Sequence, residues 1–272
     1  MNRIDGKIAI VTGGSQGLGA AIARNFAEMG AKGIITLGRN EEKGKKVAAE
    51  ISKDTGCDIE FVKTDVAVVS QCRQAVAHTK NKFGKVDILV NAAGLTDRGN
   101  IVETSEELFD RMININVKGP FFLTQEVVKI MIEQDIKGSI VNIGSQAAVT
   151  GQPFLASYSL SKGALATMTK NTAFALLINN IRVNQLNIGW MASDGEHQIQ
   201  TKFHGAPENW LEDAAKEQPF KRLLGTIEVA KAVTFLASAD SGMMTGSVID
   251  FDQSVVGGYP FSPPKPPEKM SI

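Results

Sequence analysis

The sequence has little cysteine and no excess of charge of either sign. Two of its 272 residues are cysteines, and 29 basic residues balance 29 acidic ones. Two cysteines cannot build a disulfide framework and suit a reducing compartment, so we expect a cytoplasmic protein. Nucleic-acid-binding proteins usually carry a basic excess, so we expect no nucleic-acid partner. No apolar run approaches the roughly 18 residues of a membrane span, and no signal peptide is apparent, so we expect no membrane partner.

Short runs rich in β-branched residues alternate with longer segments of helical period. The strand-like runs lie at 8–12, 33–37, 59–62, 86–90, 138–143, 181–184 and 246–250. The helical segments lie at 18–29, 41–52, 71–83, 106–133, 157–178 and 227–238. Nearly continuous apolar strands are typical of a parallel sheet that is covered on both faces. The pattern predicts an α/β fold, a doubly wound (Rossmann) parallel sheet of about seven strands with helices on both faces.

The chain shows no internal linker rich in proline and glycine within its first 255 residues. We therefore expect a single domain over residues 1–258. The segment 190–224 has weak periodicity, and long insertions of this kind are often lids, so we expect a substrate lid there. Five of the nine prolines lie in 259–272, where we expect an extended or disordered C-terminal tail.

A glycine-rich loop, Thr12-Gly-Gly-Ser-Gln-Gly-Leu-Gly19, separates the first strand from the first helix. Glycine allows a tight turn and a close approach of the backbone to a pyrophosphate. The helix that follows directs its free N–H groups and its positive dipole end at the phosphates. The loop therefore predicts a dinucleotide site with the contacts Gly13, Ser15, Gln16, Gly17, Leu18 and Gly19.

The end of the second strand bears on the choice of dinucleotide. An NAD site usually has an acidic residue there, whereas this strand ends in Gly38, Arg39 and Asn40. A guanidinium suits a 2′-phosphate, and glycine leaves room for it. These three residues favour NADP(H), while the acidic pair Glu41 and Glu42 keeps NAD(H) possible.

The T-G-x-x-x-G-x-G spacing, together with the chain length, resembles the short-chain dehydrogenase/reductase family over roughly residues 4–255. Asp65 and Val66 look like the pair that meets the adenine in that family. The segment 91–94, Asn-Ala-Ala-Gly, is similar to the family's N-N-A-G motif, with Ala92 in place of the second asparagine. The resemblance thus implies further cofactor contacts after the third, fourth and sixth strands, namely Asp65, Val66, Asn91, Ala92, Ala93, Gly94 and Gly189.

Four residues match the family's catalytic positions. Tyr158 and Lys162 lie four apart on one predicted helix and project from the same face. We expect Tyr158 to be the general acid/base, and we expect Lys162 to lower its pKa and to hold the nicotinamide ribose. Ser145 follows the fifth strand and is expected to orient the substrate oxygen. By the family's pattern, Asn116 holds a water in a proton relay behind Lys162, and Asn114 is the rival residue.

No metal site is predicted. His197 and His204 lie seven apart, which is not the spacing of a helical ligand pair, and His78 stands alone on a helix. We expect all three histidines at the surface.

Two places depart from the family's pattern. Ile188 replaces the proline of the usual Pro-Gly after the sixth strand, which leaves the geometry of that loop open. The family's D-G-G near the end is here Asp252-Gln253-Ser254. Neither departure touches the Ser/Tyr/Lys set.

The resemblance implies an alcohol dehydrogenase or carbonyl reductase that transfers a hydride between nicotinamide and a secondary alcohol or ketone. Polar residues near the expected substrate walls favour a small molecule such as a sugar or polyol: Gln146, Gln152, Ser193, Asp194, Glu196 and His197. Trp190 either stacks on a sugar ring or seals the lid. A 3-oxoacyl thioester reductase is the alternative enzyme, and a non-catalytic dinucleotide-binding sensor or scaffold is the alternative from another class. The resemblance also implies a homo-oligomer, tetramer or dimer, with the segments 106–133 and 157–178 between subunits.

Overall fold

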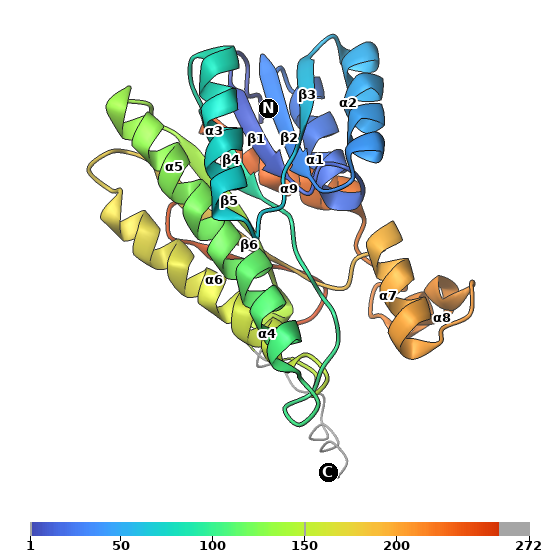
Figure 1. The fold of residues 1–272 in the computed structure, drawn as a ribbon. Helices are drawn as coiled ribbons and strands as arrows, with labels where there is room; N and C mark the ends of the chain where they lie inside the picture. The colour runs from blue at the N-terminus through green and yellow to red at the C-terminus, as the bar shows by residue number, and fades with distance from the viewer. Residues whose placement is uncertain (1, 150, 256–272) are drawn as a thin grey trace.

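The computed structural model describes residues 2–149 and 151–255, so the expected tail at 259–272 lies outside the described residues. Seven parallel strands form a sheet with the order β3-β2-β1-β4-β5-β6-β7 (Figure 1). The strands are β1 (Ile8–Thr12), β2 (Gly33–Gly38), β3 (Asp58–Lys63), β4 (Ile88–Asn91), β5 (Ser139–Ser145), β6 (Arg182–Ile188) and β7 (Val248–Phe251). The predicted doubly wound sheet is confirmed.

Helices cover both faces of this sheet. One face carries α1 (Gly17–Glu28), α2 (Glu41–Thr55) and α9 (Thr226–Ala237). The other carries α3 (Val69–Phe83), α5 (Gly119–Glu133) and α6 (Ala156–Ala175), which stand together in Figure 1. Neighbouring strand residues enter opposite cores: Val11 and Val90 face α1 and α9, whereas Ile10 and Leu89 face α3 and α5. This alternation explains why the strands are apolar throughout.

The predicted helix over 106–133 is interrupted by a wider turn. It consists of α4 (Glu106–Ile113), a π-helical turn (Asn114–Lys118) and α5, and the N–H of Gly119 reaches back to the carbonyl of Asn114. Single π turns inside α-helices are frequent at functional sites. Asn116 lies within this turn and is buried.

Strand β6 extends four residues beyond the predicted end at 184, because its polar residues are paired inside the protein. Gln185 Nε2 donates to Asn187 Oδ1 at 2.7 Å, and the Thr169 hydroxyl donates to Gln185 Oε1 at 3.1 Å. Buried polar side chains are compatible with a central strand when they are hydrogen-bonded in this way.

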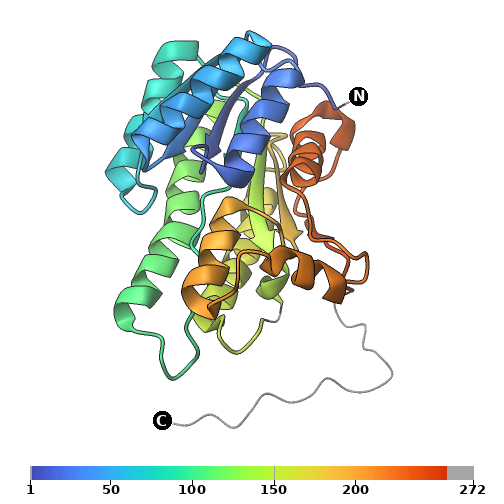
Figure 2. The ribbon, with the colours of Figure 1, turned by 90° about the vertical axis from the view of Figure 1, so that its right-hand side faces the viewer.

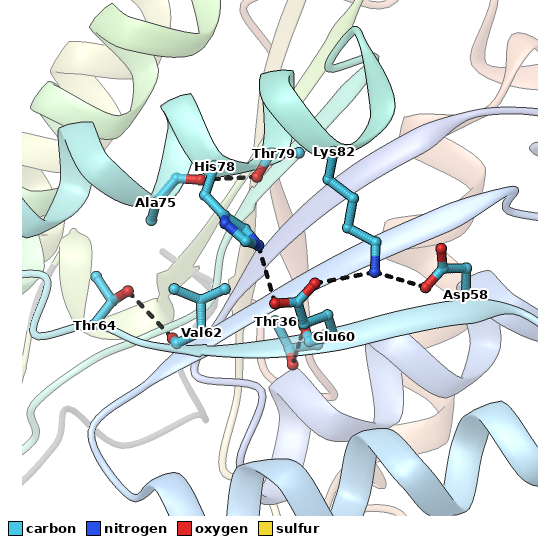
Figure 3. A network of polar contacts seen from close by, with 9 residues as sticks. All are labelled: Thr36, Asp58, Glu60, Val62, Thr64, Ala75, His78, Thr79 and Lys82. Carbon is cyan, nitrogen blue, oxygen red and sulfur yellow. Dashed lines mark hydrogen bonds and ion pairs between the residues drawn. The ribbon is translucent and has the colours of Figure 1, made fainter.

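Charged side chains line β3, the edge strand next to α3 (Figure 3). Lys82 of α3 donates to Asp58 at 2.8 Å and to Glu60 at 3.0 Å, and His78 Nε2 lies 3.0 Å from Glu60 Oε1. Charges on an edge strand discourage pairing with the strand of another chain.

The segment 190–224 folds into two short helices, α7 (Asp194–His204) and α8 (Trp210–Glu217), which the sequence did not predict. Ser193 starts α7 by accepting a hydrogen bond from the Glu196 N–H at 3.1 Å. Trp210 is buried and donates to His197 Nδ1 at 2.9 Å. Figure 2 shows the two helices side by side in front of the lower part of the sheet.

Among the described residues, no helix has the length and apolarity that a membrane crossing requires.

Candidate active site

A cavity of about 1070 Å³ lies at the carboxyl ends of the strands. The strand order reverses between β1 and β4, and ligands of open α/β sheets bind at such a reversal. Thr12, the last residue of β1, joins the two loops at this point, because its hydroxyl accepts from the N–H groups of Ala92 and Ala93, both at 2.8 Å. The cavity therefore begins where a dinucleotide site is expected.

The glycine loop forms one wall of this cavity. Gly13 has φ +75°, and a Cβ at this position would lie 3.2 Å from the backbone of Ala93. A Cβ at Gly19 would lie 2.3 Å from the carbonyl oxygen of Gly13. Helix α1 begins at Gly17, and the side chain of Gln16 makes no capping hydrogen bond to it. The first N–H groups of α1 are therefore left for an anion, as a phosphate cradle requires.

Most of the predicted cofactor residues line the cavity: Gly13, Ser15, Gln16, Gly17, Leu18, Gly19, Gly38, Arg39, Asp65, Val66, Ala92, Ala93, Gly94 and Gly189. Asn40 and Asn91 are not among its lining residues. Asn40 instead caps α2 by accepting from the Lys43 N–H at 3.0 Å. Asn91 is buried, and its Nδ2 donates to Asn142 Oδ1 at 2.8 Å.

Arg39 is exposed at the end of β2 and makes no ion pair within the described part of the chain. A Cβ at Gly38 would lie 3.2 Å from Phe61 and 3.4 Å from Ser15 Oγ, so a side chain there would crowd this corner. The free guanidinium, the glycine loop and the uncapped helix fit the phosphate groups of a dinucleotide.

Ser145, Tyr158 and Lys162 line the same cavity. Ser145 ends β5 and is hydrogen-bonded to Tyr158 on α6. The ammonium of Lys162 is buried, donates to the carbonyl of Ile143 at 2.8 Å and lies 5.7 Å from the centre of the Tyr158 ring. The structure thus brings Ser145, at the end of β5, to the same cavity as Tyr158 and Lys162, which lie together on α6.

Burial is the largest influence on the pKa values of Tyr158 and Lys162. It raises the pKa of the Tyr158 phenol, and the hydrogen bond to Ser145 and the charge of Arg98 oppose this shift. That Lys162 lowers the pKa of Tyr158 stays a prediction. Burial also lowers the pKa of Lys162 to about 8.

The side-chain amide of Asn116 fixes the loop after β4. Its Oδ1 accepts from the Leu95 N–H at 2.8 Å, and its Nδ2 donates to the Leu95 carbonyl at 2.9 Å and to Ser161 Oγ at 3.0 Å. Asn114 forms no such side-chain hydrogen bond to any described residue. A Cβ at Gly94 would lie 3.6 Å from Asn116 Oδ1 and 3.7 Å from Lys162 Nζ, so Asn116 and Lys162 both border this glycine. Its role as a water ligand stays a prediction.

Arg98 is a cavity residue that the sequence reasoning missed. It lies in the loop after β4, outside every motif, and donates to the Thr96 carbonyl at 2.9 Å and to His204 Nε2 at 3.2 Å. Its guanidinium lies 5.4 Å from the centre of the Phe154 ring and 3.7 Å from Glu196 Oε1. Nothing in the sequence placed a loop arginine opposite the helices of the segment 190–224.

Trp190 packs within the lid segment. Its ring stacks on Trp210 with centres 5.8 Å apart, and its Nε1 donates to Glu196 Oε1 at 2.8 Å. Trp190 also lines the cavity, so both roles considered for it stay predictions. The three histidines are exposed as predicted, although His204 also lines the cavity.

The two departures from the family's pattern have local explanations. Ile188 ends β6 at the cavity wall, and a Cβ at the next residue, Gly189, would lie 1.8 Å from Asp252 Oδ1, so this loop is held by close packing. Gln253 Oε1 accepts from the Phe220 N–H, and its Nε2 donates to the Arg222 carbonyl, both at 2.8 Å. Gln253 thereby ties the end of the lid segment to β7.

Comparison with known proteins agrees with this geometry. A family model described as Enoyl-(Acyl carrier protein) reductase, of the short-chain dehydrogenase type, matches residues 13–256. An uncharacterized oxidoreductase of Thermotoga maritima is 41% identical over 247 residues, which cover 91% of this chain and 96% of that protein.

Two solved structures share the fold. L-sorbose reductase from Gluconobacter frateurii, complexed with NADPH and L-sorbose, superposes with a TM-score of 0.87 at 28% identity and covers 95% of this chain and 100% of its own. A NAD+-bound xylitol dehydrogenase superposes with a TM-score of 0.84 at 30% identity and covers 90% of this chain and 97% of its own.

Proposed function

Because the chain belongs to the short-chain dehydrogenase/reductase family of oxidoreductases, we propose that it interconverts a secondary alcohol and a ketone with a nicotinamide dinucleotide as hydride carrier. The observation that carries this proposal is the placement of Ser145, Tyr158 and Lys162 on one cavity wall at the strand reversal, next to the glycine loop. The family membership alone would not assign the chemistry, since function depends on the site.

Each residue has a distinct part in the proposed reaction. The Ser145 hydroxyl holds the substrate oxygen, and the Tyr158 phenol gives that oxygen a proton during reduction. The raised pKa of Tyr158 keeps the phenol protonated at neutral pH, which is the form that donates. Lys162 holds the nicotinamide ribose next to Tyr158. When bound, the nicotinamide supplies or accepts the hydride.

NADP(H) is the cofactor we favour. The guanidinium of Arg39 is free to form a charge-assisted fork with a 2′-phosphate. The NADPH in L-sorbose reductase supports this assignment, whereas the NAD+ in xylitol dehydrogenase keeps NAD(H) as the alternative.

A sugar or polyol is the substrate class we favour. Gln146, Gln152, Glu196 and Gln200 give the cavity wall hydrogen-bonding groups beyond the catalytic residues. The names of the two structural relatives, which refer to L-sorbose and xylitol, support the same class. A 3-oxoacyl thioester reductase is the second candidate, and the description of the matching family model favours it.

The remaining proposals concern the domain organisation and the assembly of the protein. We propose one domain over residues 1–258 in which 190–224 acts as a lid, because α7 and α8 carry several cavity residues. We also propose that the protein assembles as a homo-oligomer. A cytoplasmic location stays a prediction from the sequence.

The test measures NADPH oxidation with a panel of ketoses that includes L-sorbose, and in parallel with acetoacetyl thioesters. We expect ketose turnover, and a loss of about 100-fold or more in kcat for Tyr158→Phe with unchanged NADPH affinity. Turnover of thioesters alone would favour the second candidate. Dinucleotide binding without turnover of any substrate would favour the sensor or scaffold.

A further inference from the structure

We propose that Arg98 and Glu196 form a charge-neutral clamp that selects uncharged polyhydroxylated substrates and excludes their carboxylate analogues. This inference rests on the proposed function, because it names the substrate class of the same cavity. It adds two specificity-determining residues that belong to no catalytic motif.

The two side chains form an ion pair without a direct hydrogen bond. Arg98 Nη2 lies 3.7 Å from Glu196 Oε1, which is too long for a hydrogen bond, and each side chain is 15% exposed. Arg98 comes from the loop after β4, whereas Glu196 comes from α7. Arg98, Glu196 and Tyr158 line the same cavity.

Neighbouring hydrogen bonds hold the Arg98 guanidinium and the Glu196 carboxylate in place. One nitrogen of Arg98 and one oxygen of Glu196 make no hydrogen bond to a described residue. Arg98 uses Nη1 for the Thr96 carbonyl and Nε for His204, so Nη2 donates no hydrogen bond to any described residue. Glu196 uses Oε1 for Trp190 Nε1 at 2.8 Å and for Gln200 Nε2 at 2.7 Å. Its Oε2 accepts no hydrogen bond from the described chain. The pair thus offers one free donor beside one free acceptor.

A hydroxyl group matches this pair, because it can accept from Nη2 and donate to Oε2. A carboxylate can only accept, so it would satisfy Arg98 and meet the negative charge of Glu196. Like charges placed together in an interface cost several kcal/mol. Without Glu196, the arginine alone would be a good carboxylate site.

The other charges of the cavity balance in the same way. Besides Arg98 and Glu196, the lining contains two cationic side chains, Lys162 and Arg39, and two carboxylates, Asp252 and Asp65. The Arg98 guanidinium also donates to His204 Nε2 at 3.2 Å. The lysine and arginine cations of the lining are therefore matched by an equal number of carboxylates.

Gln146 independently points to an uncharged ligand with several hydroxyl groups. It follows Ser145 directly and lines the cavity. Its Nε2 and Oε1 are both buried and have no hydrogen-bond partner among the described residues. A buried amide without partners is unusual in proteins, and a second hydroxyl of the substrate would satisfy it.

The experiment compares matched polyols and aldonates by isothermal titration calorimetry. Xylitol, xylonate, galactitol and galactonate are titrated into the protein saturated with NADPH, a state in which polyols are not oxidised. The wild type is expected to bind each polyol about 100-fold more tightly than its aldonate. Glu196→Gln, which removes the charge and keeps the shape, is expected to reduce this preference at least about tenfold by improving aldonate binding.

Two further variants make the outcome specific. Arg98→Gln is expected to weaken polyol binding without improving aldonate binding. Asp194→Asn removes the same charge from the exposed first turn of α7, outside the cavity, and is expected to leave the preference unchanged. Equal binding of polyol and aldonate by the wild type, an unchanged preference in Glu196→Gln, or no binding of any of the four ligands would overturn the clamp. Selective polyol binding without hydride transfer in the ketose assay would overturn the proposed function and leave the clamp standing.

Discussion

Arg39 is the residue on which the choice of cofactor depends. It is exposed at the cavity wall, and no carboxylate precedes it at the end of β2. Charge-assisted hydrogen bonds contribute about 1.5–3 kcal/mol, so we expect Arg39→Ala to weaken NADPH binding about 10- to 100-fold. NADH, which lacks the 2′-phosphate, should bind as before. Fluorescence titration with both dinucleotides measures the two effects.

A control from the same region separates this contact from general electrostatics. Lys43→Ala removes a nearby exposed cation that does not line the cavity, and its NADPH affinity should stay within about threefold of the wild type. Equal losses of NADPH and NADH affinity in Arg39→Ala would contradict a 2′-phosphate contact.

Lys162 gives the protein a defined dependence of stability on pH. Burial lowers its pKa to about 8 in the folded protein, whereas the ordinary pKa of a lysine side chain is 10.5. Between these values the unfolded chain binds more protons, so the free energy of unfolding rises with pH. Below pH 8 Lys162 is protonated in both the folded and the unfolded protein, so the folded protein bears the full free-energy cost of the buried charge. Relative to Lys162→Met, the wild type should gain about 2 kcal/mol between about pH 7 and about pH 9.5.

Urea unfolding of both proteins across this pH range measures the gain. The comparison cancels the other groups with shifted pKa values, among them the buried thiols Cys57 and Cys72, because both proteins contain them. A difference between the two proteins that does not change with pH would show that Lys162 keeps an ordinary pKa.

Residues inside motifs were predictable from sequence, and residues outside them were not. The glycine loop and the Ser145, Tyr158 and Lys162 positions carry fixed spacings, and all of them line one cavity. Asn91 lies in a motif but faces the core, because a motif gives the position of a side chain along the chain and not its direction. Arg98 contacts residues that are distant from it in the sequence, so no local sequence pattern predicts its position at the cavity.

At the scale of elements, the π turn at 114–118 links helix geometry to the site. It places the Asn116 amide against both polar groups of the Leu95 backbone and against Ser161. We expect Asn116→Ala to lower the free energy of unfolding by about 1–3 kcal/mol, since it leaves these groups unpaired. We also expect lower turnover, because the loop after β4 carries Arg98 and borders Lys162. Urea unfolding and the ketose assay measure the two effects.

Asn114→Ala is the matched control, since Asn114 lies in the same turn and its side chain makes no hydrogen bond to a described residue. This substitution should lower the free energy of unfolding by less than about 1 kcal/mol. If both variants lost the same stability, the amide of Asn116 would have no special part in holding the loop.

The strongly periodic elements were predictable, whereas two features of the fold depend on distant partners. Strand β6 continues through Gln185 and Asn187 because the core supplies hydrogen bonds to them. Helix α7 and helix α8 form where the sequence shows weak periodicity, and the stacking of Trp190 on Trp210 accompanies them. Neither the hydrogen bonds of β6 nor the stacking of the two tryptophans can be predicted from a short stretch of sequence.

At the scale of the whole molecule, one surface carries unusual apolar exposure. Phe121 and Ile132 of α5 lie partly exposed, and at the end of α6 Phe174 is 79% and Ile178 is 92% exposed. Figure 1 shows α5 and α6 side by side, on the side of the sheet away from α2. Exposed apolar side chains that gather on neighbouring helices are typical of an interface between proteins.

This surface predicts association of identical subunits. Light scattering of the eluted protein should give a mass of two or four times the 29.1 kDa of one chain. Phe174→Glu would bury a charge in the interface, which is costly, so we expect it to lower the mass toward that of one chain while the helical circular dichroism persists. Lys46→Glu on α2, at the opposite side, should leave the assembly unchanged. A wild-type protein of single-chain mass, or a Phe174→Glu variant with unaltered mass, would show that this apolar surface serves another purpose.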